Sequence, residues 1–203
     1  MTSKLILIAA AMLAGCIMPD RVVKLYEDTD FDGGPFSNVL VVGAHEDSDA
    51  RRRFESSVVR SLNASGTDAT SSIEVMGSGQ DITRESLLAA TSTSGSDAVL
   101  ITRLVDVQSR AEIQQGRTTV VADRRGNLPL AGFFRYDYTE YQDPMTVTTV
   151  RTVVLATDLY NVDDENRIWS VESTSFDKET VDATIDGASR AISTTLLQDG
   201  LIR

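Results

Sequence analysis

The chain contains one cysteine and one histidine, and these two residues limit the chemistry that it can perform. A single thiol cannot close a disulfide within the chain, so Cys16 is free, bonded to another molecule or chemically modified. His45 precedes Glu46 and Asp47, and an imidazole beside carboxylates could act as a general base or a metal ligand. No second histidine or further cysteine completes a familiar catalytic triad or zinc set. We therefore expect a solvated loop, no enzyme and no cofactor, with a small-ligand binder or hydrolase at His45-Glu46-Asp47 as the alternative.

The residues around Cys16 indicate how this thiol is modified. Lys4 is followed by an apolar run over residues 5–13, which is too short to cross a bilayer as a helix because about 20 residues are needed. The run ends in Leu13-Ala14-Gly15-Cys16, which resembles the lipobox of bacterial lipoproteins. This resemblance implies that residues 1–15 form a cleaved signal peptide and that Cys16 carries acyl chains. Two or more chains are sufficient for stable membrane anchoring.

The same resemblance implies a location. Ile17 stands where lipoproteins retained in the inner membrane usually have Asp. The expected location is therefore the outer membrane, with the lipid-anchored protein facing the periplasm.

The charge of the chain excludes nucleic acid as a partner. Lys and Arg number 19 against 30 Asp and Glu, a formal net charge of −11. Such a chain repels phosphate backbones and anionic lipid headgroups. Its contact with a membrane should therefore come from acyl chains on Cys16.

Residues 16–37 are expected to form a lipidated N-terminus and a flexible tether. Within them, Asp28, Asp30 and Asp32 have the spacing that begins a calcium-binding loop. The twelfth loop position would be Val39, where a calcium loop needs a bidentate glutamate. The three aspartates are thus a weak calcium candidate, and a solvated acidic linker is the favoured interpretation.

The first half of residues 38–203, which we predict to form one domain, alternates strands and helices. Residues 38–43 predict a buried strand, 68–76 a second strand and 97–105 a third. Apolar periodicity predicts helices over residues 47–65 and 81–94. This order indicates a parallel sheet with right-handed crossovers.

The first helix has two distinct faces. Phe54 and Val58 belong to an apolar stripe that should pack on the sheet. The run of residues 51–53 consists of three arginines and is expected to be a solvated face, with Arg51 and Glu55 spaced to form a local pair.

The second half predicts an antiparallel hairpin and a closing helix. Residues 146–160 and 167–176 read as strands joined by a polar turn, and residues 181–199 carry a helical apolar stripe. The predicted fold class is α/β: β-α-β-α-β, then an antiparallel hairpin and a C-terminal helix, arranged as a two-layer or three-layer sandwich.

Residues 108–144 form an aromatic-rich insertion that is too long for an ordinary connection. Arginines and aromatic rings are the side chains that dominate binding energy at protein interfaces. The partner-binding hypothesis rests on Arg124, Arg125, Phe134, Arg135, Tyr136 and Tyr138. In the alternative interpretation, Phe134, Tyr136 and Tyr138 alternate along a strand and cover one edge of the sheet.

The order of elements between Asn38 and Leu197 resembles small α/β domains of envelope lipoproteins, such as the penicillin-binding-protein activator LpoB, the curli-secretion lipoprotein and the amino-terminal domain of TolB. The resemblance implies a non-catalytic scaffold or accessory of a cell-envelope complex, with an envelope protein as partner and possible homo-oligomers. A further alternative is a subunit of an outer-membrane secretion assembly, with residues 108–144 as a membrane-crossing hairpin. The apolar alternation of that segment is too weak to favour it.

Overall fold

The computed structural model describes residues 20–114, 118–123, 137–142, 145–176 and 180–203. The strands are β1 (Arg21–Glu27), β2 (Asn38–Ala44), β3 (Asp68–Ser71), β4 (Ala98–Gln114), β5 (Thr118–Asp123), β6 (Asp137–Gln142), β7 (Thr146–Asn161) and β8 (Arg167–Phe176). The helices are α1 (Ser48–Ala64), α2 (Ser72–Met76), α3 (Arg84–Ser94) and α4 (Val181–Gln198).

One mixed sheet forms the body of the protein. Its strand order is β1-β8-β7-β4-β2-β3, and β5 and β6 pair separately with each other. β2 lies parallel to both β3 and β4, whereas β4-β7, β7-β8 and β8-β1 are antiparallel. The α/β fold class, with the antiparallel hairpin and the C-terminal helix, is confirmed.

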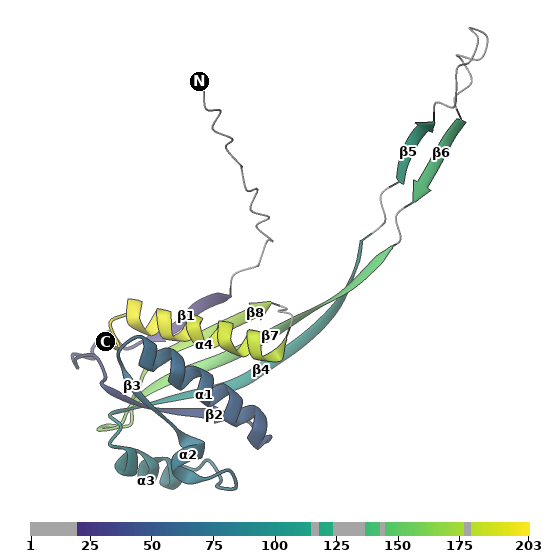
Figure 1. Cartoon of the computed structure of the whole chain (residues 1–203). Helices are drawn as coiled ribbons and strands as arrows, with labels where there is room; N and C mark the ends of the chain where they lie inside the picture. Colours follow the sequence, from purple (N-terminus) through teal and green to yellow (C-terminus); the bar gives the residue numbers. More distant parts are fainter. Residues whose placement is uncertain (1–19, 115–117, 124–136, 143–144, 177–179) are drawn as a thin grey trace, which may run out of the picture.

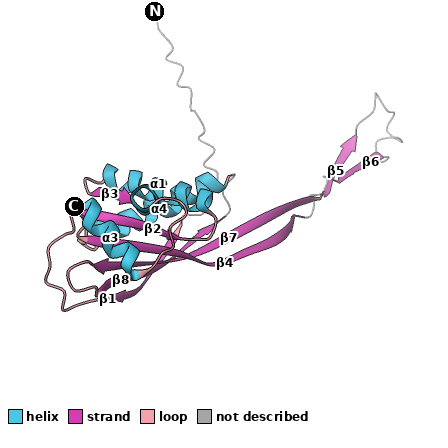
Figure 2. Ribbon diagram, turned by 90° about the horizontal axis from the view of Figure 1, so that it is seen from below, coloured by secondary structure: helices cyan, strands magenta, loops and turns pink. Residues whose placement is uncertain are grey.

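Helices cover both faces of the parallel part of the sheet. Alternate side chains of β2 point to opposite faces, so Val39 and Val41 pack in one core and Leu40 and Val42 in another. The first core includes α1 and α4, and the second includes α2 and α3. This half of the body therefore has three layers (Figures 1 and 2).

A fully buried carboxylate connects the first core to the sheet. The Glu55 side chain accepts hydrogen bonds from the Gly43 N–H at 2.8 Å and from the Arg51 guanidinium at 2.9 Å. It also accepts from the Ser71 and Ser72 hydroxyls at 2.6 and 2.7 Å and from the N–H of residue 73 at 2.9 Å. A buried carboxylate is stable only when such donors replace water. Glu55 thus connects the end of β2, the first turns of α1 and the β3-α2 junction.

The predicted hairpin and closing helix are confirmed. The turn between β7 and β8 is held by the Asp164 carboxylate, and the hydrogen bond that it accepts from the Asn166 N–H lowers the pKa of Asp164. α4 begins at its cap Thr180. Beyond its end, Asp199 accepts hydrogen bonds from the Trp169 indole at 2.7 Å and from Lys24 at 2.8 Å, and the latter bond raises the pKa of Lys24.

β4 and β7 extend beyond their neighbours in the sheet. β2 accompanies β4 only as far as Arg103, and β8 begins to pair with β7 only at Thr152. We define the arm as residues 105–114 of β4 and 146–151 of β7 (Figures 1 and 2). The outer edge of β4 is open along the arm, and from the Ser109–Arg151 pair outward β4 and β7 form a two-stranded ribbon.

Three expectations about secondary structure were wrong. The predicted tether contains β1, an edge strand, and Phe36 is a core residue that bridges to Ile202. Residues 68–76 form the short strand β3 and the one-turn helix α2 rather than one strand, since Glu55 caps this junction. The third predicted strand, residues 97–105, is too short, because β4 runs from Ala98 to Gln114 and includes the start of the 108–144 segment.

One expectation about the first helix also requires correction. Arg51 is buried and ion-paired with Glu55, so it does not belong to a solvated face, although the predicted pairing is confirmed. The apolar stripe packs on the sheet as predicted, with Phe54 half-buried against the first core and Val58 fully buried within it. The helix therefore turns Arg51, Glu55, Val58 and Leu62 inward and leaves Phe54 at the edge of the core.

We predict that Glu55→Gln lowers the free energy of unfolding by about 3–5 kcal/mol, the cost of leaving a buried charge unpaired. The NH₂ group of the glutamine would face the N–H and hydroxyl donors that now bond to the carboxylate. The Arg51 guanidinium would also lose its buried counter-charge. Urea denaturation followed by the fluorescence of Trp169 measures the change, and Glu46→Gln, on the exposed loop before α1, is the matched control. A midpoint shared by both variants would contradict the role given to Glu55.

Candidate functional site

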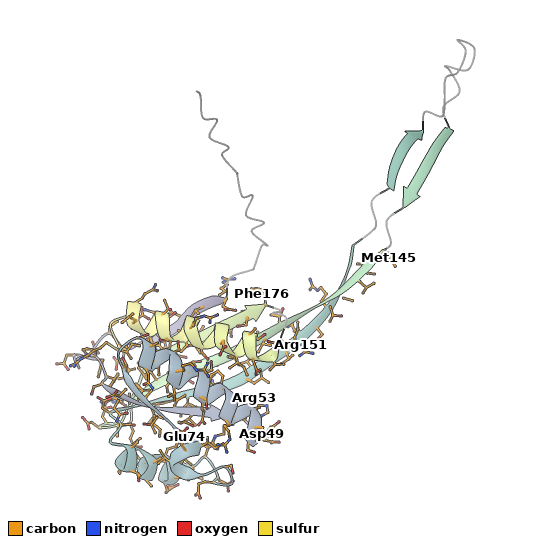
Figure 3. The ribbon with its side chains drawn as sticks, in the orientation of Figure 1. Asp49, Arg53, Glu74, Met145, Arg151 and Phe176 are labelled. Atoms are coloured by element: carbon orange, nitrogen blue, oxygen red, sulfur yellow. The ribbon has the colours of Figure 1, made fainter. Side chains whose placement is uncertain are left out.

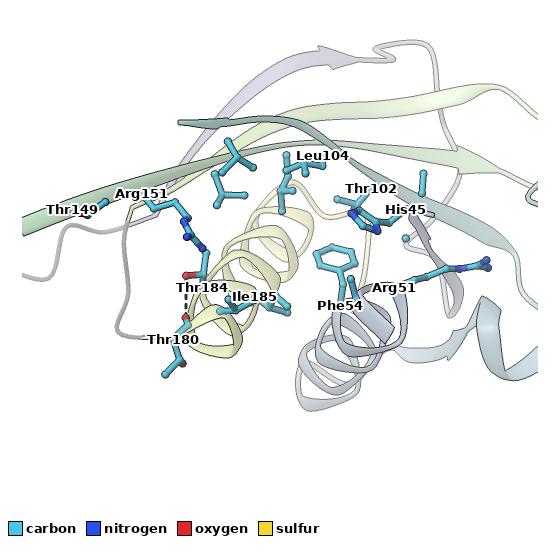
Figure 4. Close-up of a pocket in the computed structure, with 17 residues that line it drawn as sticks. His45, Arg51, Phe54, Thr102, Leu104, Thr149, Arg151, Thr180, Thr184 and Ile185 are labelled. Carbon is cyan, nitrogen blue, oxygen red and sulfur yellow. Dashed lines mark hydrogen bonds between the residues drawn. The ribbon is translucent and has the colours of Figure 1, made fainter. Parts of the chain in front are cut away.

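The root cleft is a cavity of about 480 Å³ at the base of the arm (Figure 4). Its floor is the sheet surface of β4 and β7, and its walls come from the end of β2 and the first turns of α1 and α4. It therefore lies beyond the carboxyl ends of β2 and of the body portion of β4. This is the edge of an open α/β sheet where ligands commonly bind.

Apolar side chains dominate the lining of the root cleft. A β-bulge between Leu104 and Asp106 keeps Leu104 and Val107 on the same face of β4, although they are three residues apart. Val153 and Leu155 oppose them on β7. The helices contribute Phe54 and Ile185.

The charged groups of the root cleft are all basic. Arg51 and Arg151 line it, together with His45, and no Asp or Glu is among its described lining residues. Arg51 is committed to Glu55. Arg151 is exposed, points toward the N-terminal turn of α4 (Figures 3 and 4), and has no ion pair with any described residue.

The loop predicted as an alternative site borders the root cleft through His45 alone. The Nδ1 atom of His45 accepts a hydrogen bond from the Asp47 N–H at 3.0 Å. The Asp47 carboxylate caps α1, and bonds from the N–H groups of Asp49 and Ala50 lower its pKa. Within the described part of the chain, no hydroxyl lies at hydrogen-bond distance from His45, so the three loop residues form no nucleophile–base pair there.

The arm has an apolar face that the body leaves uncovered. Side chains alternate between the two faces of β4. One face carries Val107 and Ile113, and the opposite face carries polar residues such as Gln108 and Arg110. Ile113 is 61% exposed and its cross-strand neighbour Val147 is 57% exposed. Surface side chains of this size are usual singly, but here they are paired across two strands.

Most of the partner-binding residues predicted from the sequence lie outside the described residues. These are Arg124, Arg125, Phe134, Arg135 and Tyr136. Tyr138 lies in β6, where its backbone pairs with that of Ala122. Cys16 also lies outside the described residues. These assignments stay predictions.

The calcium candidate is not assembled. Asp28, Asp30 and Asp32 follow β1, and the Asp28 carboxylate accepts a hydrogen bond from the Asp30 N–H at 3.1 Å. Over the residues that the structure describes, no three His, Cys, Asp or Glu side chains are grouped as metal ligands. Within the same ranges no helix has the length and apolar character that crossing a membrane requires.

No protein-family model and no curated protein matches the sequence. Among solved structures, the chain is similar to PelC of Paraburkholderia phytofirmans, described as a dodecamer, with 13% identity and a TM-score of 0.48 over 91% of this chain and 99% of PelC. It is also similar to the lipoprotein GNA1162 of Neisseria meningitidis, with 14% identity and a TM-score of 0.43 over 80% of this chain and 97% of that one. The description as a dodecamer belongs to PelC, and the description as a lipoprotein belongs to GNA1162.

The root cleft was not predicted from the sequence. Its lining residues are spread from Gly43 to Ile185, and each belongs to an element with its own periodicity. The one available signal was the position of His45 after a buried strand, which predicted a site at this edge of the sheet but not its chemistry.

We predict that calcium does not stabilise the protein. A ligand that binds only the folded state adds about 2.7 kcal/mol to the free energy of unfolding at a hundredfold excess over its dissociation constant. Melting curves with millimolar calcium and with a chelator should therefore coincide. An increase in the melting temperature that disappears in Asp30→Asn would show that the three aspartates do form a site.

Proposed function

We propose that the protein is a lipid-anchored, non-catalytic accessory of a cell-envelope complex, and that it binds protein partners through the arm. The amphipathic, unaccompanied arm is the observation that carries this proposal. The lipobox resemblance at Cys16 supports the anchor and a periplasm-facing position on the outer membrane.

The arm has the properties of an assembly element rather than a spacer. An isolated two-stranded ribbon is marginally stable in water, so a long one needs a further partner. Beyond Arg103 on β4, and before Thr152 on β7, each outer strand edge carries backbone groups that no described strand pairs. Such edges are templates for strand addition.

A second copy of the chain is the partner that this geometry favours. One arm offers two open edges of different sequence, so the β4 edge of one copy can pair with the β7 edge of another. That contact is heterologous and can be repeated from copy to copy. It would also continue the apolar face across the joined arms, so that Ile113 and Val147 contact side chains of the neighbouring copy.

We predict that Ile113→Lys combined with Val147→Lys prevents co-purification of an untagged copy with a tagged one. Truncating a buried interface anchor typically costs about 2–4 kcal/mol, which corresponds to at least a 30-fold loss of affinity. Co-expression, mild cross-linking and affinity capture of the full chain measure the loss. Because both side chains are exposed, the melting temperature should stay nearly parental.

Gln108→Lys is the control on the polar face of β4, and it is compared with the single variant Ile113→Lys, which adds the same one charge to the apolar face. Gln108→Lys should leave co-purification intact. Retention of the untagged copy by the Ile113 and Val147 variant would contradict docking through the apolar face, and equal loss in the two single variants would show only a sensitivity to charge.

We predict that Cys16→Ser gives an uncleaved or soluble product, whereas the parent chain partitions into detergent. The thiol is the acceptor of the acyl chains, and serine lacks it. Detergent phase separation and intact mass of the amino-terminal peptide measure the outcome. Parental partitioning without acyl mass on Cys16 would contradict the anchor.

A subunit of an outer-membrane secretion assembly is the second candidate, because β4 runs into the 108–144 segment paired with β7, and β5 and β6 of that segment pair antiparallel with each other. Protease digestion of sealed outer-membrane vesicles separates the candidates. An arm in the aqueous compartment is cut once the vesicles are opened, whereas an arm within the bilayer stays protected.

A further inference from the structure

We propose that the root cleft binds an acyl chain with a carboxylate head group, a fatty-acid-like ligand. This inference concerns the base of the arm and does not depend on docking between arms. Its basis is a cavity of ligand size with an apolar body and basic polar groups in an acidic chain.

The dimensions and lining of the cavity fit a single acyl chain. Small-molecule sites usually enclose about 300–1,000 Å³ and are largely apolar, and the root cleft encloses about 480 Å³. Leu104, Val107, Val153 and Leu155 form a continuous aliphatic floor. Phe54 and Ile185 close the opposite side (Figure 4). An acyl chain would bury these half-exposed side chains without leaving a polar group unpaired.

The charge of the lining selects the head group. The chain contains 30 acidic residues, yet none is among the described residues that line the cleft. Arg51 cannot serve as the head-group partner, because its guanidinium is buried and bonded to Glu55 and Ser72. Arg151 is at the arm side of the cleft, exposed and without an ion pair among the described residues.

The planar guanidinium of Arg151 can bind a carboxylate through two parallel hydrogen bonds. Thr149 also lines this part of the cleft, and its hydroxyl offers a further donor to the same head group. A cationic head group would instead face Arg151 and be repelled. The cleft should therefore distinguish two amphiphiles that differ only in the sign of the head-group charge.

The test uses the full-length chain in phosphatidylcholine vesicles and a twelve-carbon fatty acid with a photoreactive diazirine in mid-chain. After illumination, mass spectrometry of peptides locates the label. We expect labelling of the segments around Leu104 and Val153, and competition by dodecanoate but not by dodecylamine. Arg151→Gln should reduce labelling about tenfold, since a charge-assisted pair is lost.

Arg110→Gln is the matched control, because it removes an exposed arginine from the opposite face of the same arm. It should label as the parent does. Val153→Trp provides a second variant that keeps Arg151 and fills the cavity, and it should also abolish labelling at Leu104.

Label confined to other segments, equal competition by dodecanoate and dodecylamine, or equal labelling of the Arg151 and Arg110 variants would each overturn the proposal. Because Arg151 is exposed and unpaired among the described residues, its replacement should leave the melting temperature unchanged. A loss of labelling is then a loss of the ligand contact.

Discussion

The hydrogen-bond network of the buried Glu55 carboxylate is the constraint on which the rest of the structure depends. It fixes the end of β2 through the Gly43 N–H, the start of α1 through Arg51, and the entry to α2 through Ser71 and Ser72. A buried carboxylate with five donors has few alternative arrangements, because each lost donor leaves a buried acceptor site without a hydrogen bond. The network therefore determines where β2 stops, and β2 stops where β4 leaves the body.

The arm and the root cleft both follow from that end of β2. With β2 ended at Ala44, β4 continues beside β7 alone, and the sheet surface there is covered only by the first turns of α1 and α4. The incomplete cover leaves the cleft, and the missing neighbour strands leave the open edges. A body that is tightly packed around Glu55 thus supports a ribbon whose outer strand edges are open, and these edges are the basis of the proposed assembly through the arm.

The sequence predicted elements whose signals are local. Val39–Val42, the α4 stripe and the β7-β8 turn are defined within a few residues, and each was correct. Arg51 and Glu55 were predicted to pair, but their burial depends on hydroxyls about twenty residues away, which the helix pattern does not reveal. β1 was missed because an exposed edge strand has no apolar alternation. The root cleft joins side chains from five elements, and no local pattern combines them.

Amide hydrogen exchange on the full-length protein tests the central claim, that the arm is completed by a second copy, most directly. Half of the N–H groups in residues 105–114 and 146–151 point away from the partner strand within the arm, since paired strands use alternate groups. The account predicts that these outward amides exchange slowly in the assembled protein and within seconds in the arm variant that combines Ile113→Lys with Val147→Lys. Fast exchange at these amides in both proteins would contradict it.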